Sequence, residues 1–346
     1  MRIFYSEKHA LRDAQTELDG GLLARPYEHP GRMTRILEAL KARGLGPVEP
    51  PGAYGLDPVR RVHDAAYLHF LSRCWREWRA AGHEGEAIPV IWPSRRLWRE
   101  IAPKNIEGML GFYALAAETS ITEGTWEAAK AAADTALSAA AAIAAGAPAA
   151  FALCRPPGHH AAADMFGGYC FLNNAAIAAQ ALRDAGAERV AVLDVDFHHG
   201  NGTQSIFYDR RDVFFASIHG APEDAFPHFL GYADETGAGA GEGFTANYPL
   251  SRGTAWPEWS AALGDALARL KVFRPEALVL SLGVDAYHGD PISFFALETE
   301  DFQRMGAAIA GLGAPTALVM EGGYADDALG VNVVAALEGF SGGGAR

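Results

Sequence analysis

Six short apolar runs divide the chain, and they constrain its fold more than any other feature. They are IFY at 3–5, AFALC at 150–154, VAVLDV at 190–195, VFFASI at 213–218, ALVLSLG at 277–283 and TALVM at 316–320. None alternates apolar with polar residues, which is typical of strands covered on both faces. Segments with helical periodicity separate them, at 31–43, 125–145, 173–185, 256–273, 300–312 and 328–340. We therefore predict an α/β fold with a mainly parallel central sheet and helices on both of its faces.

The domain organisation, net charge and cysteine content of the chain limit what it can do. No linker, repeat or charge block divides the 346 residues, so we expect a single catalytic domain over residues 1–346. The formal net charge is -13, from 42 acidic and 29 basic residues, and this argues against nucleic-acid binding. We also expect no membrane segment, because the most apolar tract is mostly alanine. Three scattered cysteines, without a visible signal peptide, predict buried free thiols and a cytoplasmic protein.

The segment from Gly82 to Lys104 differs from the rest of the chain. It contains three prolines, two tryptophans and a Ser-Arg-Arg, and it shows no strong periodicity. Long loops in compact domains are often functional or interfacial. We expect an insertion at about 82–104.

The segment LDVDFHHGNG, residues 193–202, closes the third apolar run with ionisable side chains. Alternation along an extended strand places Asp194, Asp196 and His198 on one side of its carboxyl end, where open α/β sheets bind ligands. A divalent cation would relieve the repulsion between the two aspartates. Asp285 follows the fifth run and completes an Asp-His-Asp set of the size that zinc uses in catalysis. The alternative is that the aspartates cap turns and the histidine packs in the core.

Two further apolar runs also end in polar chemistry. CRPPGHHA, at 154–161, presents His159 and His160 after a rigid turn, and paired histidines suit acid–base work. MEGGY, at 320–324, ends in Tyr324, whose hydroxyl is a candidate donor to an oxyanion. Four apolar runs thus end in polar residues. A purely structural interpretation needs a separate explanation for each of them, whereas one hydrolytic metal site explains all four.

The motifs RPPGHHA, GGYCFLNNAAIAA, LDVDFHHGNGTQ, SLGVD and MEGGY resemble those of the zinc-dependent histone deacetylase superfamily. The N-terminal SEKHALRDAQTELDGG and the segment NIEGMLGFYALAAETSITEGTWEAA extend the resemblance over nearly the whole chain. They point to one branch, the bacterial acetylpolyamine amidohydrolases. The resemblance implies the arginase–deacetylase fold. It also implies hydrolysis of N-acetylated polyamines, such as acetylputrescine and acetylcadaverine, to acetate and free amine.

The resemblance also assigns roles to individual residues. The implied zinc ligands are Asp196, His198 and Asp285, with ferrous iron as the other possible metal. The implied catalytic residues are His159, His160 and Tyr324, with Asp194 supporting His159. Asp194 and Ser217 are implied in holding a structural K⁺ or Na⁺. Asn201 departs from many histone deacetylases, which have an aspartate there behind the second histidine, and this leaves the charges of His159 and His160 open.

The substrate-binding residues are implied in the same way. Tyr169 and Phe226 resemble aromatic walls of a tunnel, and Glu107 and Glu118 match positions associated with the cationic end of the substrate. The insertion at 82–104 corresponds to a dimer-forming loop, so we expect a homodimer that admits slim polyamines.

The resemblance and the residues together suggest a mechanism. His160 takes a proton from the attacking water, Tyr324 polarises the amide carbonyl, and His160 or His159 protonates the leaving amine. We expect His199 to be structural and leave His219 and His228 open. Three alternatives remain at this point: a deacetylase of acetyl-lysine in proteins or of other small acylamines, a metal- or polyamine-binding protein without turnover, and a dinuclear manganese ureohydrolase.

Overall fold

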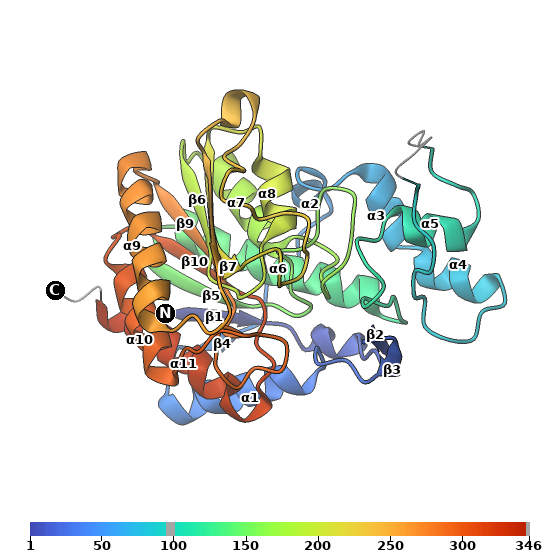
Figure 1. Ribbon diagram of the computed structural model, residues 1–346, viewed down its shortest axis with the longest axis horizontal. Coiled ribbons are helices and arrows are strands. Elements are labelled where there is room, and N and C mark those ends of the chain that lie inside the picture. The colour runs from blue at the N-terminus through green and yellow to red at the C-terminus, as the bar shows by residue number, and fades with distance from the viewer. Residues whose placement is uncertain (95–100, 344–346) are drawn as a thin grey trace.

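The computed structural model describes residues 1–94 and 101–343, and a parallel sheet lies at its centre (Figure 1). Within those residues the sheet has eight strands in the order β4-β1-β5-β10-β9-β6-β7-β8, and every pairing is parallel. The strands are β1 (Arg2–Tyr5), β4 (Val48–Glu49), β5 (Ala149–Leu153), β6 (Val190–Asp194), β7 (Val213–Gly220), β8 (Thr245–Leu250), β9 (Ala277–Leu282) and β10 (Thr316–Met320). All six predicted strands are present, and the predicted fold class is confirmed.

Helices cover both faces of this sheet, and each face has its own apolar core (Figure 1). One face carries α6 (Thr125–Ala144), α7 (Asn174–Asp184) and α8 (Asn201–Phe207). The other carries α1 (Gly31–Arg43), α9 (Trp256–Phe273), α10 (Thr299–Ala310) and α11 (Asp326–Gly343). Successive residues of a central strand point into the two cores in turn, which is why the strands are apolar at every position.

The chain also has smaller elements outside the sheet and the helices that cover it. They are η1 (Glu7–Leu11), the hairpin β2 (Glu17–Asp19) and β3 (Leu22–Ala24), α2 (Asp57–Arg60), α3 (Ala65–Leu71), α4 (Cys74–Ala80), α5 (Ile106–Phe112) and η2 (Gly239–Gly241). The predicted insertion at 82–104 is irregular where it is described, with one bridge from Ala87 to Ile121. Residues 95–100 of that insertion lie outside the described residues.

The order of the strands brings the candidate residues together. The four adjacent central strands β5, β10, β9 and β6 are the ones followed by His159, Tyr324, Asp285 and Asp196. Because these strands are parallel, their carboxyl ends share one edge of the sheet. The sequence motifs therefore converge at one place.

Two general expectations can be compared with the structure. Cys74, Cys154 and Cys170 are buried and free, as predicted. In residues 1–94 and 101–343, no helix combines the length and the apolar character needed to cross a membrane.

Candidate metal centre and active site

Three side chains form a buried group of metal donors at the carboxyl edge of the sheet. Asp196 and His198 follow β6, Asp285 follows β9, and their donor atoms lie within 4.8 Å of one another. His198 Nδ1 is 3.0 Å from Asp285 Oδ2 and 3.3 Å from Asp196 Oδ1. We call these three residues the metal-donor triad.

Backbone amides hold the two carboxylates of the triad in place. The Phe197 N–H donates to Asp285 Oδ1 at 2.7 Å, and the Gly322 N–H donates to Asp196 Oδ2 at 2.8 Å. A Cβ at Gly322 would lie 2.6 Å from carboxylate oxygens of both aspartates. Only glycine at this position of MEGGY lets the backbone approach the carboxylates so closely.

The electrostatics of the triad show a site that is short of positive charge. Burial and the charge of Asp196 raise the pKa of Asp285 to about 8. Burial alone would lower the pKa of His198, but its hydrogen bonds with Asp196 and Asp285 raise that pKa to about 10. Both shifts favour an extra positive charge between the carboxylates. Two carboxylates and one imidazole fit a divalent cation such as Zn²⁺, so the residues present suit the implied metal.

The tandem histidines lie beside the triad with different partners. His159 Nδ1 is 2.9 Å from Asp194 Oδ2, and His160 Nδ1 is 2.7 Å from Asn201 Oδ1. The Asn201 amide nitrogen donates to the backbone oxygen of His160 at 3.4 Å, which fixes the amide's orientation. Asn201 therefore presents an oxygen to His160, Nδ1 carries the proton, and Nε2 of His160 keeps its lone pair.

These partners drive the two histidines to opposite charges. Burial alone would lower the pKa of His159, but the charges of Asp194 and Asp196 raise it well above its usual value. Burial and the neighbouring charges of His159 and His198 lower the pKa of His160 well below its usual value. An amide at position 201 does not offset this effect as a carboxylate would. These opposite shifts favour a charged His159 and a neutral His160.

The loop that follows β10 holds Tyr324 beside the metal-donor triad and the tandem histidines. The backbone N–H of Tyr324 donates to Asp290 Oδ2 at 2.7 Å, and the Arg32 guanidinium lies 4.7 Å from its ring centre. Burial raises the pKa of Tyr324 well above its usual value, so the hydroxyl keeps its proton. It can donate a hydrogen bond to an oxygen at the centre of the site.

Arg32 belongs to a second buried charged group, the arginine cluster, in which Glu28 is surrounded by Arg12, Arg32 and Arg155. The Glu28 carboxylate is 3.1 Å from Arg12 Nη1, 3.3 Å from Arg32 Nη1 and 2.7 Å from Arg155 Nε. Arg32 also donates to the backbone oxygens of Glu321 and Gly323, both at 2.8 Å. The cluster therefore ties the N-terminal segment to the MEGGY loop.

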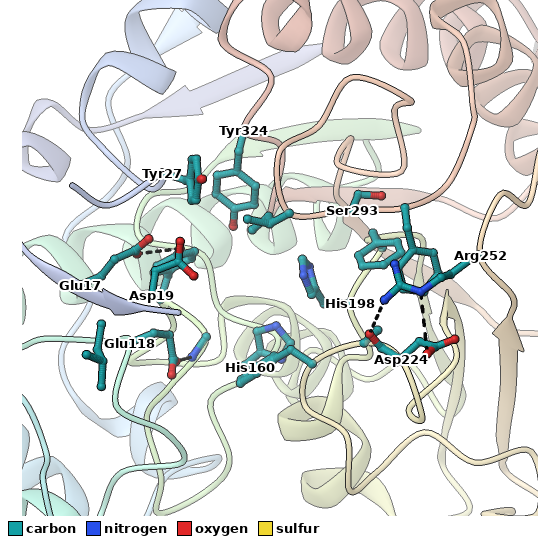
Figure 2. A pocket seen from close by; sticks show the side chains of 18 residues that line it. Glu17, Asp19, Tyr27, Glu118, His160, His198, Asp224, Arg252, Ser293 and Tyr324 are labelled. Atoms are coloured by element: carbon teal, nitrogen blue, oxygen red, sulfur yellow. Dashed lines mark hydrogen bonds and ion pairs between the residues drawn. The ribbon is translucent and has the colours of Figure 1, made fainter. Parts of the chain in front are cut away.

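A cavity of about 390 Å³ opens onto His160, His198 and Tyr324 (Figure 2). Tyr169 and Phe226, the two predicted aromatic walls, both line it. The Phe226 ring meets the His160 ring edge to face at 5.0 Å. The Tyr169 hydroxyl donates to Glu17 Oε2 at 2.8 Å, which fixes that ring against the wall.

The two predicted glutamates lie in different places. Glu118 lines the cavity, where its Oε1 accepts the Gly168 N–H at 2.7 Å. Glu107 is half exposed on α5, 3.2 Å from His83 Nε2, and it is not among the described residues that line the cavity. The structure of one chain therefore brings Glu118 to the site but not Glu107.

Several residues of the cavity were not predicted. Glu17 and Asp19 reach it from the hairpin, and Asp224, Arg252 and Ser293 reach it from loops. Their spacing in the sequence gives no signal, since packing alone brings these segments to the carboxyl edge. The alternation of Glu17 and Asp19 on one short strand was the only available hint.

Asp194 and Ser217, predicted to help hold a monovalent cation, are register partners on β6 and β7 and are fully buried. Ser217 Oγ is 2.8 Å from His219 Nδ1. His199 bonds Gln204 and Asn247, and neither His199, His219 nor His228 lines the cavity among the described residues. These contacts agree with a structural role for His199.

Comparison with known proteins gives a consistent result over nearly the whole chain. A model of the histone deacetylase domain matches residues 26–340. The acetylpolyamine amidohydrolase of Mycoplana ramosa is 57% identical over 342 residues, which are 99% of this chain and 100% of that protein.

Solved structures agree with this comparison. The crystal structure of the acetylpolyamine aminohydrolase from Burkholderia pseudomallei has a TM-score of 0.95 and 43% identity, and the match covers 99% of both chains. The HDA15 HD domain has a TM-score of 0.80 and 26% identity, over 99% of this chain and 91% of that one. Membership of this family implies a metal-dependent enzyme that hydrolyses amides, and the buried metal-donor triad agrees with this. The chain belongs to the histone deacetylase family, as its motifs predict.

Proposed function

We propose that this protein hydrolyses the amide of N-acetylated polyamines to acetate and the free amine, with one Zn²⁺ per chain at Asp196, His198 and Asp285. One observation carries the proposal. The metal-donor triad, a neutral His160 and a protonated Tyr324 meet at the floor of a single cavity that has acidic side chains on its wall. The relatives named acetylpolyamine amidohydrolases support the choice of substrate.

A divalent metal held by the triad supplies Lewis acidity toward the amide carbonyl and toward water. The residues of the chain supply the proton transfers. His160 is neutral with its Nε2 lone pair free, so it takes a proton from the attacking water. Tyr324 donates its hydroxyl hydrogen bond to the carbonyl oxygen as negative charge develops there. His160 then returns the proton to the leaving nitrogen.

His159 has a different task in this scheme. Its Nδ1 lies 2.9 Å from Asp194 Oδ2, whose charge raises its pKa, so we assign His159 as the charged histidine rather than as the base. Its ring lies 4.1 Å from the ring of His160. A fixed positive charge at that distance keeps His160 from accepting a proton before the substrate arrives. Asp194 holds His159 in this role.

The cavity selects a slim, cationic substrate. The rings of Tyr169 and Phe226 leave room for an aliphatic chain and bury it against apolar surface. Glu118, together with Glu17 and Asp19, offers carboxylates to a distal ammonium group. Glu107 belongs to this acidic set only if a second chain brings it to the mouth.

The loop at 82–104 supports a homodimer of single-domain chains. Val90, Ile91 and Ile101 on its described parts are largely exposed, which is unusual for aliphatic side chains that have no partner. The cytoplasmic location remains a prediction, supported by the three buried free cysteines. The monovalent cation beside Asp194 and Ser217 also remains a prediction.

The dinuclear ureohydrolase alternative has less support. A second buried group of possible ligands consists of His159, Cys170 and Glu321. However, Glu321 Oε2 already accepts the Gly158 N–H at 2.7 Å and the His159 N–H at 3.2 Å. Burial also raises the pKa of the Cys170 thiol well above its usual value, which disfavours the thiolate that metals bind.

The test is a substrate panel with zinc-loaded protein. N-acetylputrescine and N-acetylcadaverine are compared with an acetyl-lysine peptide, and kcat/KM is measured for each. We expect the acetylated diamines to be the better substrates by at least about tenfold, because the peptide lacks the distal ammonium group. A peptide that is hydrolysed as well as the diamines would replace this proposal with a protein deacetylase.

A further inference from the structure

Charged side chains lie on two sides of the cavity, with carboxylates alone on one side and an arginine beside a carboxylate on the other (Figure 2). Glu17, Asp19 and Glu118 lie on one side of His198, and Arg252 lies on the other beside Asp224. Among the residues that the structure describes, Arg252 is the only arginine or lysine that lines the cavity. An acetylated diamine has no group for Arg252 to bind, because its only charge is a cation.

The Arg252 side chain is held in position, but its contacts do not use all of its hydrogen-bond donors. It follows β8, and its guanidinium stacks 4.4 Å from the centre of the Phe294 ring. Its Nη2 donates to the backbone oxygen of Asp224 at 3.3 Å, and its Nε is 3.8 Å from Asp224 Oδ1. Both side chains of this ion pair are about half exposed, so the pair is weak and can exchange for another anion. A guanidinium has five N–H donors and suits a carboxylate.

A ligand that satisfies both sides carries an ammonium and a carboxylate close together. The two groups of a free α-amino acid branch from one carbon on different bonds, so they face different walls when the side chain runs into the cavity. In Nε-acetyl-lysine the chain from the acetamide nitrogen to the α-ammonium, the α-carbon included, has the same number of carbons as in N-acetylcadaverine. Nε-acetyl-lysine would place its acetamide on the floor, its ammonium at the acidic wall and its carboxylate at Arg252.

We propose that the protein also deacetylates free Nε-acetylated diamino acids, with Arg252 binding the α-carboxylate. The proposal rests on the amidohydrolase activity proposed above and adds a second class of substrate to it. The chemistry balances as an ordinary hydrolysis. The amide C–N bond breaks, water supplies hydroxyl to the acetyl carbon and a proton to the nitrogen, and lysine and acetate leave. Within a peptide, both α groups of lysine are amides, so Arg252 does not favour acetylated proteins.

The experiment compares Nε-acetyl-L-lysine with N-acetylcadaverine, which differs from it only by the carboxylate. For zinc-loaded wild type we expect both to be hydrolysed. Arg252→Gln should lower the ratio of kcat/KM for acetyl-lysine over acetylcadaverine by about tenfold, as expected for a lost hydrogen bond to a charged group. Taking the ratio within one preparation cancels any loss of folded enzyme. Arg252→Lys should restore part of the ratio.

A matched control removes the same charge elsewhere. Arg269 on α9 is exposed, is paired with Asp265 at 2.9 Å and lies outside the cavity lining, so Arg269→Gln should leave the ratio unchanged. A second comparison neutralises the ligand instead. Nε-acetyl-lysinamide lacks the carboxylate, so its kcat/KM with the wild type should be as low as that of acetyl-lysine with Arg252→Gln.

The possible outcomes separate the two proposals. Hydrolysis of acetylcadaverine but not acetyl-lysine, or an unchanged ratio in Arg252→Gln, would overturn this inference and leave the polyamine proposal standing. Hydrolysis of acetyl-lysine alone would support the role of Arg252 in binding the α-carboxylate and would overturn the polyamine proposal. Turnover of neither compound by zinc-loaded protein would overturn both.

Discussion

The metal-donor triad and the arginine cluster are both buried and charged, but they solve the problem of buried charge in opposite ways. In the arginine cluster, the Glu28 carboxylate contacts three guanidinium groups, and backbone oxygens accept several of their other N–H donors. Burial would raise the pKa of Glu28, but Arg155, Arg12 and Arg32 lower it to about 2. In the triad, two carboxylates share one imidazole, and the pKa of Asp285 rises to about 8.

The difference separates a structural group from a functional one. The arginine cluster has one carboxylate for three guanidinium groups, so it already holds excess positive charge and attracts no further cation. The triad lacks positive charge and lies beside a cavity, so it requires a cation that enters from outside. Five predictions test this contrast.

The largest effect is expected from Asp285→Asn. This change removes one of two carboxylates from the triad, so the protein should lose its metal and at least about 1000-fold in kcat/KM on N-acetylcadaverine. Metal content by mass spectrometry and steady-state kinetics give the two readouts. Asp265→Asn, an exposed carboxylate on α9, is the matched control and should change neither. An active, metal-loaded Asp285→Asn protein would contradict the role of the triad.

The arginine cluster should respond in stability rather than in metal binding. Glu28→Gln leaves three buried guanidinium groups without their carboxylate, and the free energy of unfolding should fall by about 3–5 kcal/mol. Urea unfolding measures the change, and metal content per folded chain should stay at the wild-type value. Loss of metal with unchanged stability would show that the two groups are not separate.

The same glutamate predicts a pH dependence. Its pKa is lowered on folding from 4.5 to about 2. The stabilisation is therefore fully present above pH 4.5 and is lost as the pH falls toward 2, by about 3 kcal/mol in total. Unfolding curves of wild type and Glu28→Gln should converge as the pH falls through this window. Parallel curves would show that the carboxylate is not the titrating group.

Tyr324→Phe should have a smaller effect that falls on catalysis alone. Loss of the hydroxyl donor should lower kcat by about 100- to 1000-fold while the metal stays bound. Rates and metal content are measured on the same sample. Near-wild-type activity would remove Tyr324 from the mechanism.

The smallest effect is expected from Asn201→Asp, which sharpens the contrast between His159 and His160. A carboxylate on His160 Nδ1 stabilises the charged ring, so the acidic limb of the pH–rate profile should move to higher pH by about one unit. Asn247→Asp makes the same change beside His199 and should not move the limb. An unshifted profile for Asn201→Asp would argue against His160 as the base.

Much of the fold and of the reactive centre follows from the sequence. The central strands are apolar at every position, and the triad, the tandem histidines and Tyr324 each follow such a strand directly. Parallel topology then brings them together without further information. The edge strands β4 and β8 were missed because they are partly exposed and mix polar residues, and β8 includes Pro249.

The cavity wall was harder to predict. Glu17, Asp19 and Arg252 lie on a hairpin and a turn far along the chain from the metal-donor triad, and only tertiary packing places them around His198. Glu28 looks like an ordinary glutamate in the sequence, where only Arg32 is close to it and Arg12 and Arg155 are not. Glu107 shows the reverse case, since resemblance assigned it to the substrate and a single chain does not bring it to the cavity.

Titration of metal-free protein with Zn²⁺ tests the central claim most directly. Hydrolysis of N-acetylcadaverine is followed as zinc is added in steps to a known concentration of chain. We predict no activity at the start and a linear rise that stops at one zinc per chain, because the triad is one site that needs one external cation. Full activity without metal, or a rise that continues to two ions per chain, would contradict this account.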